Sequence, residues 1–219
     1  MSEDPFRDVR NAYALLHAYH TRARDTILLF VRELCGWDEC YHTKFVNGFS
    51  NRKRDVLSDT NRWAWDFLPM HTARFTFLPN GADIDRAAKG GLMLSICLAT
   101  DTSVRGPHDN WDEASEEPRP SEDGESGLVV SLYKVDKLKT DGDPHWVRDI
   151  EREAQCVPSN AGYLAEKDHT HDSVTCVEHF IDFNDLMTAA AIRNQADLFR
   201  QRVAESPMEL DHPLKAADP

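Results

Sequence analysis

The most constraining feature is an apolar repeat near the start of the chain. Its members recur at alternating spacings of three and four residues, which places them along one side of an α-helix. Pro5 suits the first turn of a helix, Asp4 can cap it, and Gly36 is a suitable left-handed stop. The pattern therefore predicts one helix over residues 5–35, whose seam consists of Phe6, Val9, Tyr13, Leu16, His20, Ala23, Ile27, Phe30 and Leu34.

Four later segments have the composition of β-strands. Residues 70–78 alternate apolar and polar side chains, residues 91–100 are apolar on both faces, and residues 128–135 and 174–183 are rich in β-branched and aromatic side chains. We expect 91–100 to be a central strand. Together with the long N-terminal helix and a C-terminal helix, the pattern predicts an α+β fold. We expect a four-stranded, mostly antiparallel sheet with both helices packed on one face.

Shorter helical stretches are expected near residues 38–47, 51–58, 60–67 and 143–154, and the terminal helix is expected to run from about 184 to Pro207. The sequence predicts one domain, in which a helical N-terminal segment (1–69) packs on a core (70–205) made of the sheet and the C-terminal helix. We predict a mobile acidic loop at residues 101–126 and a flexible tail at residues 206–219. Both segments are rich in proline and poor in core-forming residues.

The formal net charge of −13 disfavours binding to nucleic-acid phosphates and to anionic membranes. No apolar run approaches the roughly 20 residues that cross a bilayer, and no secretory signal is visible at the start, so a cytoplasmic location is expected. The five cysteines are odd in number and scattered, which predicts reduced thiols in that compartment.

One set of residues has the atom types of a zinc site. The set is His169, His171, Cys176 and His179, whose imidazole and thiolate groups are good zinc donors. If 174–183 is a strand, however, Cys176 and His179 point to opposite faces and cannot both bind one ion without a bulge. The more ordinary reading is a polar loop that runs into a strand with one buried thiol.

A basic cluster runs against the acidic balance of the chain. Aromatic side chains accompany it, which is what an anionic or nucleic-acid ligand would favour. The competing reading is a solvated helix face above an aromatic core. The cluster consists of Lys44, Arg52, Lys53, Arg54 and Arg62. No G-x-G-x-x-G, Walker A, H-E-x-x-H or EF-hand pattern occurs, so no cofactor is expected.

Two functional hypotheses remain. The first is a non-catalytic binding or regulatory protein, in the style of bacterial or phage immunity proteins, antitoxins and inhibitors, whose acidic surface engages a basic protein partner. The alternative is an enzyme or nucleotide-binding protein of unrecognised type that uses the basic cluster at 44–62 and the histidines. The predicted first helix is about 45 Å long, more than a small sheet can cover, so a second copy of the chain is a candidate partner for its seam.

Overall fold

The computed structural model describes residues 5–37, 40–45, 72–83, 85–99, 125–138, 146, 164–168 and 172–216. The helices are α1 (Pro5–Cys35), the 3-10 turn η3 (Phe183–Leu186) and α3 (Ala189–Glu205). The strands are β1 (Cys40–Phe45), β2 (Thr72–Phe77), β3 (Leu92–Ala99), β4 (Gly127–Leu138), β5 (Leu164–Asp168) and β6 (Asp172–Asp182). None of the helices within these ranges is long and apolar enough to cross a membrane.

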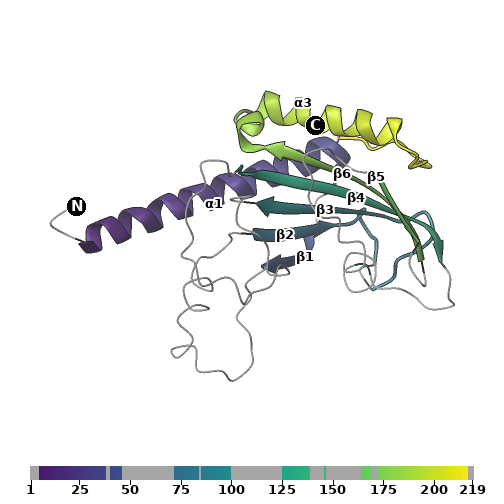
Figure 1. Cartoon of the computed structure of the whole chain (residues 1–219), viewed down its shortest axis with the longest axis horizontal. Helices are drawn as coiled ribbons and strands as arrows, with labels where there is room; N and C mark the ends of the chain where they lie inside the picture. The colour runs from purple at the N-terminus through teal and green to yellow at the C-terminus, as the bar shows by residue number, and fades with distance from the viewer. Residues whose placement is uncertain are drawn as a thin grey trace, which may run out of the picture.

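The strands form one sheet in the order β1-β2-β3-β4-β6-β5, and every neighbouring pair is antiparallel (Figure 1). The α+β class and the antiparallel sheet are confirmed, and the four predicted strands are the four central ones. The predicted strand count was too low, because β1 and β5 add one strand at each edge. The helix expected near 38–47 was wrong over 40–45, where the chain pairs with β2 as a strand.

Both long helices pack on the same face of the sheet. Inward side chains of α1 and α3 share one buried cluster with alternate residues of β2, β3, β4 and β6. In β3, for example, Leu94, Ile96 and Leu98 belong to this cluster, whereas the intervening side chains point to the other face. Residues of α1 and α3 in the cluster are Ala23, Ile27, Phe30, Val31, Leu34, Ile192, Ala196, Phe199 and Val203.

The ends of the helices follow from local sequence signals. Gly36 adopts φ 67°, and its N–H donates to the carbonyl oxygens of Val31 and Arg32, which ends α1 where a left-handed glycine was predicted. At the start of α3, the Thr188 hydroxyl accepts from the Ala191 N–H at 3.1 Å. These contacts satisfy backbone groups that the helices themselves leave open.

The segment after α3 belongs to the fold as far as the structure describes it. Met208 is buried, and Leu210 and Leu214 are partly buried against the helix-side core. The flexible tail predicted for 206–219 stays a prediction, although these three apolar side chains lie against an apolar surface.

Other predictions fall outside the described residues. They concern the helices near 51–58 and 60–67, residues 101–124 of the acidic loop, and the helix at 143–154 apart from Trp146. Trp146 itself is buried on the sheet face opposite the helices, in a second cluster with Met93 and Tyr133.

Candidate functional site

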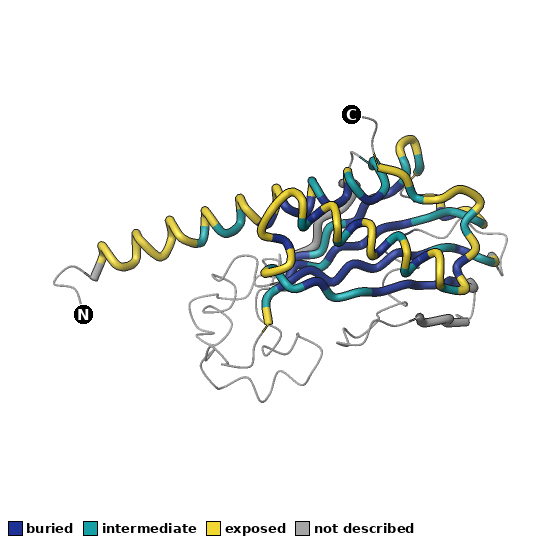
Figure 2. The backbone as a smooth tube through the Cα atoms, turned by 90° about the horizontal axis from the view of Figure 1, so that it is seen from above, coloured by how far each residue is buried: buried dark blue, intermediate teal, exposed yellow. Residues whose placement is uncertain are grey.

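The N-terminal half of α1 extends beyond the sheet as an exposed rod (Figures 1 and 2). We call residues 6–18 the arm. All of its residues are exposed except Leu16, which is half-buried. The arm nevertheless keeps the apolar seam: Phe6 is 73%, Val9 52% and Tyr13 62% exposed. Large apolar side chains gathered on one element at such exposure are typical of an interaction surface.

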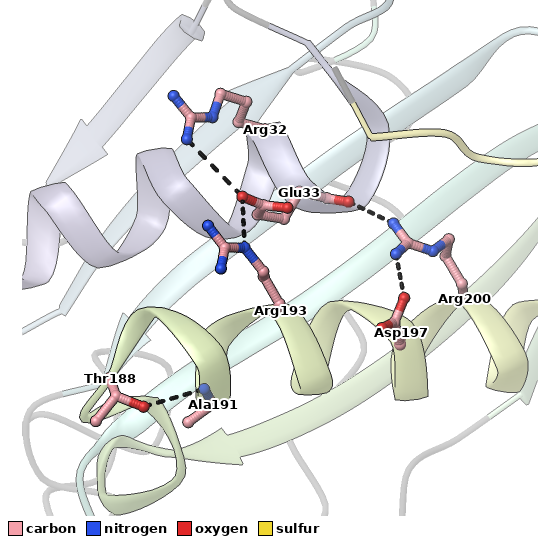
Figure 3. Close-up of polar contacts among 7 residues, drawn as sticks. All are labelled: Arg32, Glu33, Thr188, Ala191, Arg193, Asp197 and Arg200. Carbon is pink, nitrogen blue, oxygen red and sulfur yellow. Dashed lines mark hydrogen bonds and ion pairs between the residues drawn. The ribbon is translucent and has the colours of Figure 1, made fainter. Parts of the chain in front are cut away.

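The other half of α1 is fixed firmly to α3 (Figure 3). Arg200 of α3 donates to the carbonyl oxygens of Glu33 and Leu34, the latter at 3.0 Å, and so satisfies the open C-terminal end of α1. The Glu33 carboxylate pairs with Arg193 at 3.2 Å. This exposed pair adds little stability by itself. The guanidinium at the helix end gives the arm a defined direction.

Aromatic contacts mark the point where the arm leaves the body. The ring of Tyr19 meets those of His20 and Phe183 edge-on, with centroids 5.3 and 5.9 Å apart. Arg22 donates to the Met187 carbonyl oxygen. From Ala23 onward, the seam is buried. The seam of α1 is thus divided into a covered half and an uncovered half.

The arm differs in charge from the rest of the chain. It carries Arg7 and Arg10 against the single carboxylate of Asp8, whereas the whole chain has a formal charge of −13.

At the other end of α1, burial raises the pKa of the Cys35 thiol to about 12, and the Trp37 backbone and Arg200 oppose this only in part. Burial therefore favours the neutral thiol of Cys35, which packs at the end of α1.

The proposed metal set is divided by the fold. Within β6, Cys176 packs in the cluster with Trp146, whereas His179 lies on the opposite, helix-bearing face. One ion cannot bind both. His169 and His171 lie outside the described residues, so their part of the set stays a prediction. Within the described ranges, no group of three or more His, Cys, Asp or Glu residues is placed to hold a metal ion.

The basic cluster also stays a prediction. Lys44 lies in the edge strand β1, where it is paired with Arg74 of β2. Residues 52–54 and Arg62 lie outside the described part of the chain, as does the side chain of Lys44. Among the described residues, Cys35, Cys97 and Cys176 are not in disulfides, and the reduced state of all five cysteines stays a prediction.

A row of polar side chains crosses the sheet on the face opposite the helices. Thr76, Ser95, Ser131 and Glu178 stand directly opposite one another along β2, β3, β4 and β6. All four are buried. The Ser131 hydroxyl donates to the Glu178 carboxylate at 2.8 Å. Sequence analysis missed this row, because each member alone is only one polar residue in a strand, and strand register brings them together.

We expect Ser131→Ala to lower the free energy of unfolding by about 1–2 kcal/mol, because a buried carboxylate loses one of its hydrogen-bond donors. Urea titration measures the change. The double variant Ser131→Ala, Glu178→Leu should lose less than the sum of the two single variants, because the interaction is removed with both partners. Strict additivity would show that the two side chains are not coupled.

The position of His179 makes the stability depend on pH. Burial lowers its pKa from the usual 6.5, and the positive charge of Arg202 on α3 lowers it further. As the pH falls below 6.5, the unfolded chain takes up a proton at this residue before the folded chain does, so the free energy of unfolding decreases. His179→Gln should flatten this acid limb in urea titrations from pH 8 to 5. His212→Gln, which removes an exposed imidazole that does not pack under α3, is the matched control.

Comparison with known proteins gives one match. The model of the protein family PM0109 matches residues 2–209, which include all helices and strands described above. No curated protein and no solved structure matches the chain.

Proposed function

Because this chain belongs to the PM0109 family, a name that states neither activity nor ligand, we propose its function from the structure: a non-catalytic binding protein that acts by protein–protein interaction through the arm. One observation carries the proposal. Phe6, Val9 and Tyr13 stay more than half exposed on a helix whose other half is held in the core. An isolated helix of that length gains little from its own backbone, so a partner that covers the seam would stabilise the arm.

Two further observations support a binding role over the alternative of an enzyme or nucleotide-binding protein. The four side chains of the polar row are buried, and the hydrogen bond from the Ser131 hydroxyl to the Glu178 carboxylate joins two neighbouring strands, which is a structural role. The Cys35 thiol is held protonated by burial. The acidic surface predicted to engage a partner includes residues 101–124, which lie outside the described residues, so binding through it stays a proposal.

Site-specific photo-crosslinking tests the arm directly. A photoreactive phenylalanine analogue at position 13 should form a covalent protein adduct in the native host. The same analogue at Leu198, which is exposed on α3 away from the arm, should not. Val9→Asp should abolish the adduct from position 13. Equal labelling from both positions, or none from position 13, would contradict the proposal.

A thermal-shift screen with metal ions and nucleotides tests the alternative. A ligand at a hundred times its dissociation constant adds about 2.7 kcal/mol of stability. A clear rise in melting temperature with any of them would favour the enzyme or nucleotide-binding alternative.

A further inference from the structure

The exposed and buried halves of the α1 seam form one unbroken heptad repeat. Phe6, Val9, Tyr13 and Leu16 continue, without a change of phase, the three-and-four spacing of the buried residues from Ala23 to Leu34. A repeat sustained over more than four heptads is the pattern of a helix that packs along its whole length. In the structure, the sheet covers only the second half of the repeat.

We propose that a second copy of this chain covers the first half, with the two arms packed antiparallel, seam against seam. This inference rests on the proposed function and names the partner of the same surface. A second copy supplies a seam of the same period, length and apolar character, which a self-complementary two-fold contact requires.

The fold itself selects the antiparallel direction. From Ala23 onward, the seam of each helix faces its own sheet. A parallel partner helix would have to occupy the space of that sheet. In the antiparallel arrangement, the N-terminal end of one arm, near Phe6, points toward the partner's body. The buried half of the partner's helix therefore lies beyond this end and does not meet the first copy's sheet. Arm and partner arm then overlap along their exposed seam residues, and the contact ends at the half-buried His20 and the buried Ala23 of each partner.

The antiparallel register pairs bulky side chains with complementary ones. Tyr13 faces the partner's Leu16, and Val9 faces the partner's His20. Phe6 reaches the edge of the partner body, where the seam becomes buried at the partner's Ala23. Each contact occurs twice because of the two-fold axis. The bulky ring of Phe6 thus lies next to the partner's Ala23, the smallest side chain of the seam.

The exposed area sets the strength of this dimer. The seam of one arm offers on the order of 400 Å² of apolar surface, about half of what each partner buries in a stable complex. We therefore expect a weak dimer with a dissociation constant of about 10–100 µM. Arg10 flanks the seam in each copy, and each copy carries a formal charge of −13. Like charges oppose association, so salt should strengthen this dimer.

Sedimentation equilibrium of the full chain over about 10–500 µM tests the proposal. We expect a monomer–dimer equilibrium that tightens between about 0.05 and 0.5 M salt. Tyr13→Asp, on the seam, should weaken dimerisation at least about tenfold, because it places a carboxylate at the centre of the contact. Leu15→Asp is the matched control: it is 71% exposed on the same arm but lies off the seam, and it should leave dimerisation within about twofold.

Disulfide trapping tests the direction. With Val9 opposite the partner's residue 20, the two copies of position 9 are about 16 Å apart along the axis, too far for a disulfide. Val9→Cys alone should not form a linked dimer under mild oxidation, whereas Val9→Cys combined with His20→Cys should. Linkage through Val9→Cys alone, at a level above wild type, would overturn the antiparallel arrangement.

The two proposals fail separately. A monomer at every concentration and both salt levels would overturn the second copy as partner, while a position-13 adduct with another protein would keep the binding role of the arm. Association that weakens as salt rises would overturn the apolar seam as the contact and indicate attraction between the arm and an acidic surface of the second copy. A dimer that Tyr13→Asp leaves intact would overturn the seam as its contact.

Discussion

Ile27→Asp is expected to lower the free energy of unfolding by about 4 kcal/mol or more, enough to leave much of the chain unfolded at 25 °C. Ile27 is 3% exposed, in the covered half of the α1 seam, between the sheet and α3. The change removes a large apolar side chain and places an unpaired carboxylate in its position. Circular dichroism during urea titration measures the loss.

The same helix provides the control for this variant. Leu15→Asp introduces the same carboxylate at a position that is 71% exposed, and it should change stability by less than about 0.5 kcal/mol. If Ile27→Asp were as stable as Leu15→Asp, α1 would not pack on the sheet, and the division of its seam into covered and uncovered halves would be wrong.

Gly127→Ala is expected to lower the free energy of unfolding by about 3 kcal/mol, a large effect for one methyl group. A β-carbon at Gly127 would lie 2.3 Å from the Ile181 carbonyl oxygen and 2.7 Å from the Phe180 ring. The oxygen belongs to the backbone of the paired strand β6, so the strands themselves must separate to make room. Chemical denaturation compares this variant with Lys137→Ala, which replaces an exposed side chain near the other end of β4 and should be nearly neutral.

A Gly127→Ala variant of wild-type stability would mean that the first residue of β4 does not pair closely with β6. The hydrogen bond from the Phe183 N–H to the Ser126 carbonyl oxygen, 2.9 Å long, should then be absent as well, and faster amide exchange at Phe183 would report it.

Sequence reasoning predicted best the elements whose signals are local. Residues 5–35 were predicted as a helix, and α1 has these bounds, because the seam, Pro5 and Gly36 all act within a few residues of one another. The central strands were predicted for the same reason. β3 carries apolar side chains on both faces because it has a neighbouring strand on each side and a buried cluster on each face.

The two edge strands could not be predicted in this way. β5 reads Leu-Ala-Glu-Lys-Asp, a sequence with ordinary helix propensity, and it is a strand because it pairs with β6. β1 contains His42 and Lys44 among its six residues, and its strand state depends on pairing with β2, nearly 30 residues later in the chain. At a sheet edge, tertiary pairing outweighs propensity.

The candidate site was predicted in part. The length of the α1 seam indicated that some of it would lie beyond the sheet, and Phe6, Val9 and Tyr13 are exposed as a result. Which half would be free depended on where α3 returns along the sheet, and no local signal contains that information. The pairing of Ser131 with Glu178 likewise depends on register between strands almost 50 residues apart.

The hydrogen bonds from Arg200 to the last carbonyl oxygens of α1 affect how the chain folds during synthesis. The two partners are separated by 166 residues, so nearly the whole chain must leave the ribosome before the contact can form. Until then, the apolar halves of α1 and of the sheet lack the cover that α3 provides. Long-range contacts of this kind slow folding and prolong the time for which aggregation-prone apolar surface is exposed. Truncation before α3 should therefore yield aggregates rather than a smaller folded domain, and light scattering of the truncated chain measures this.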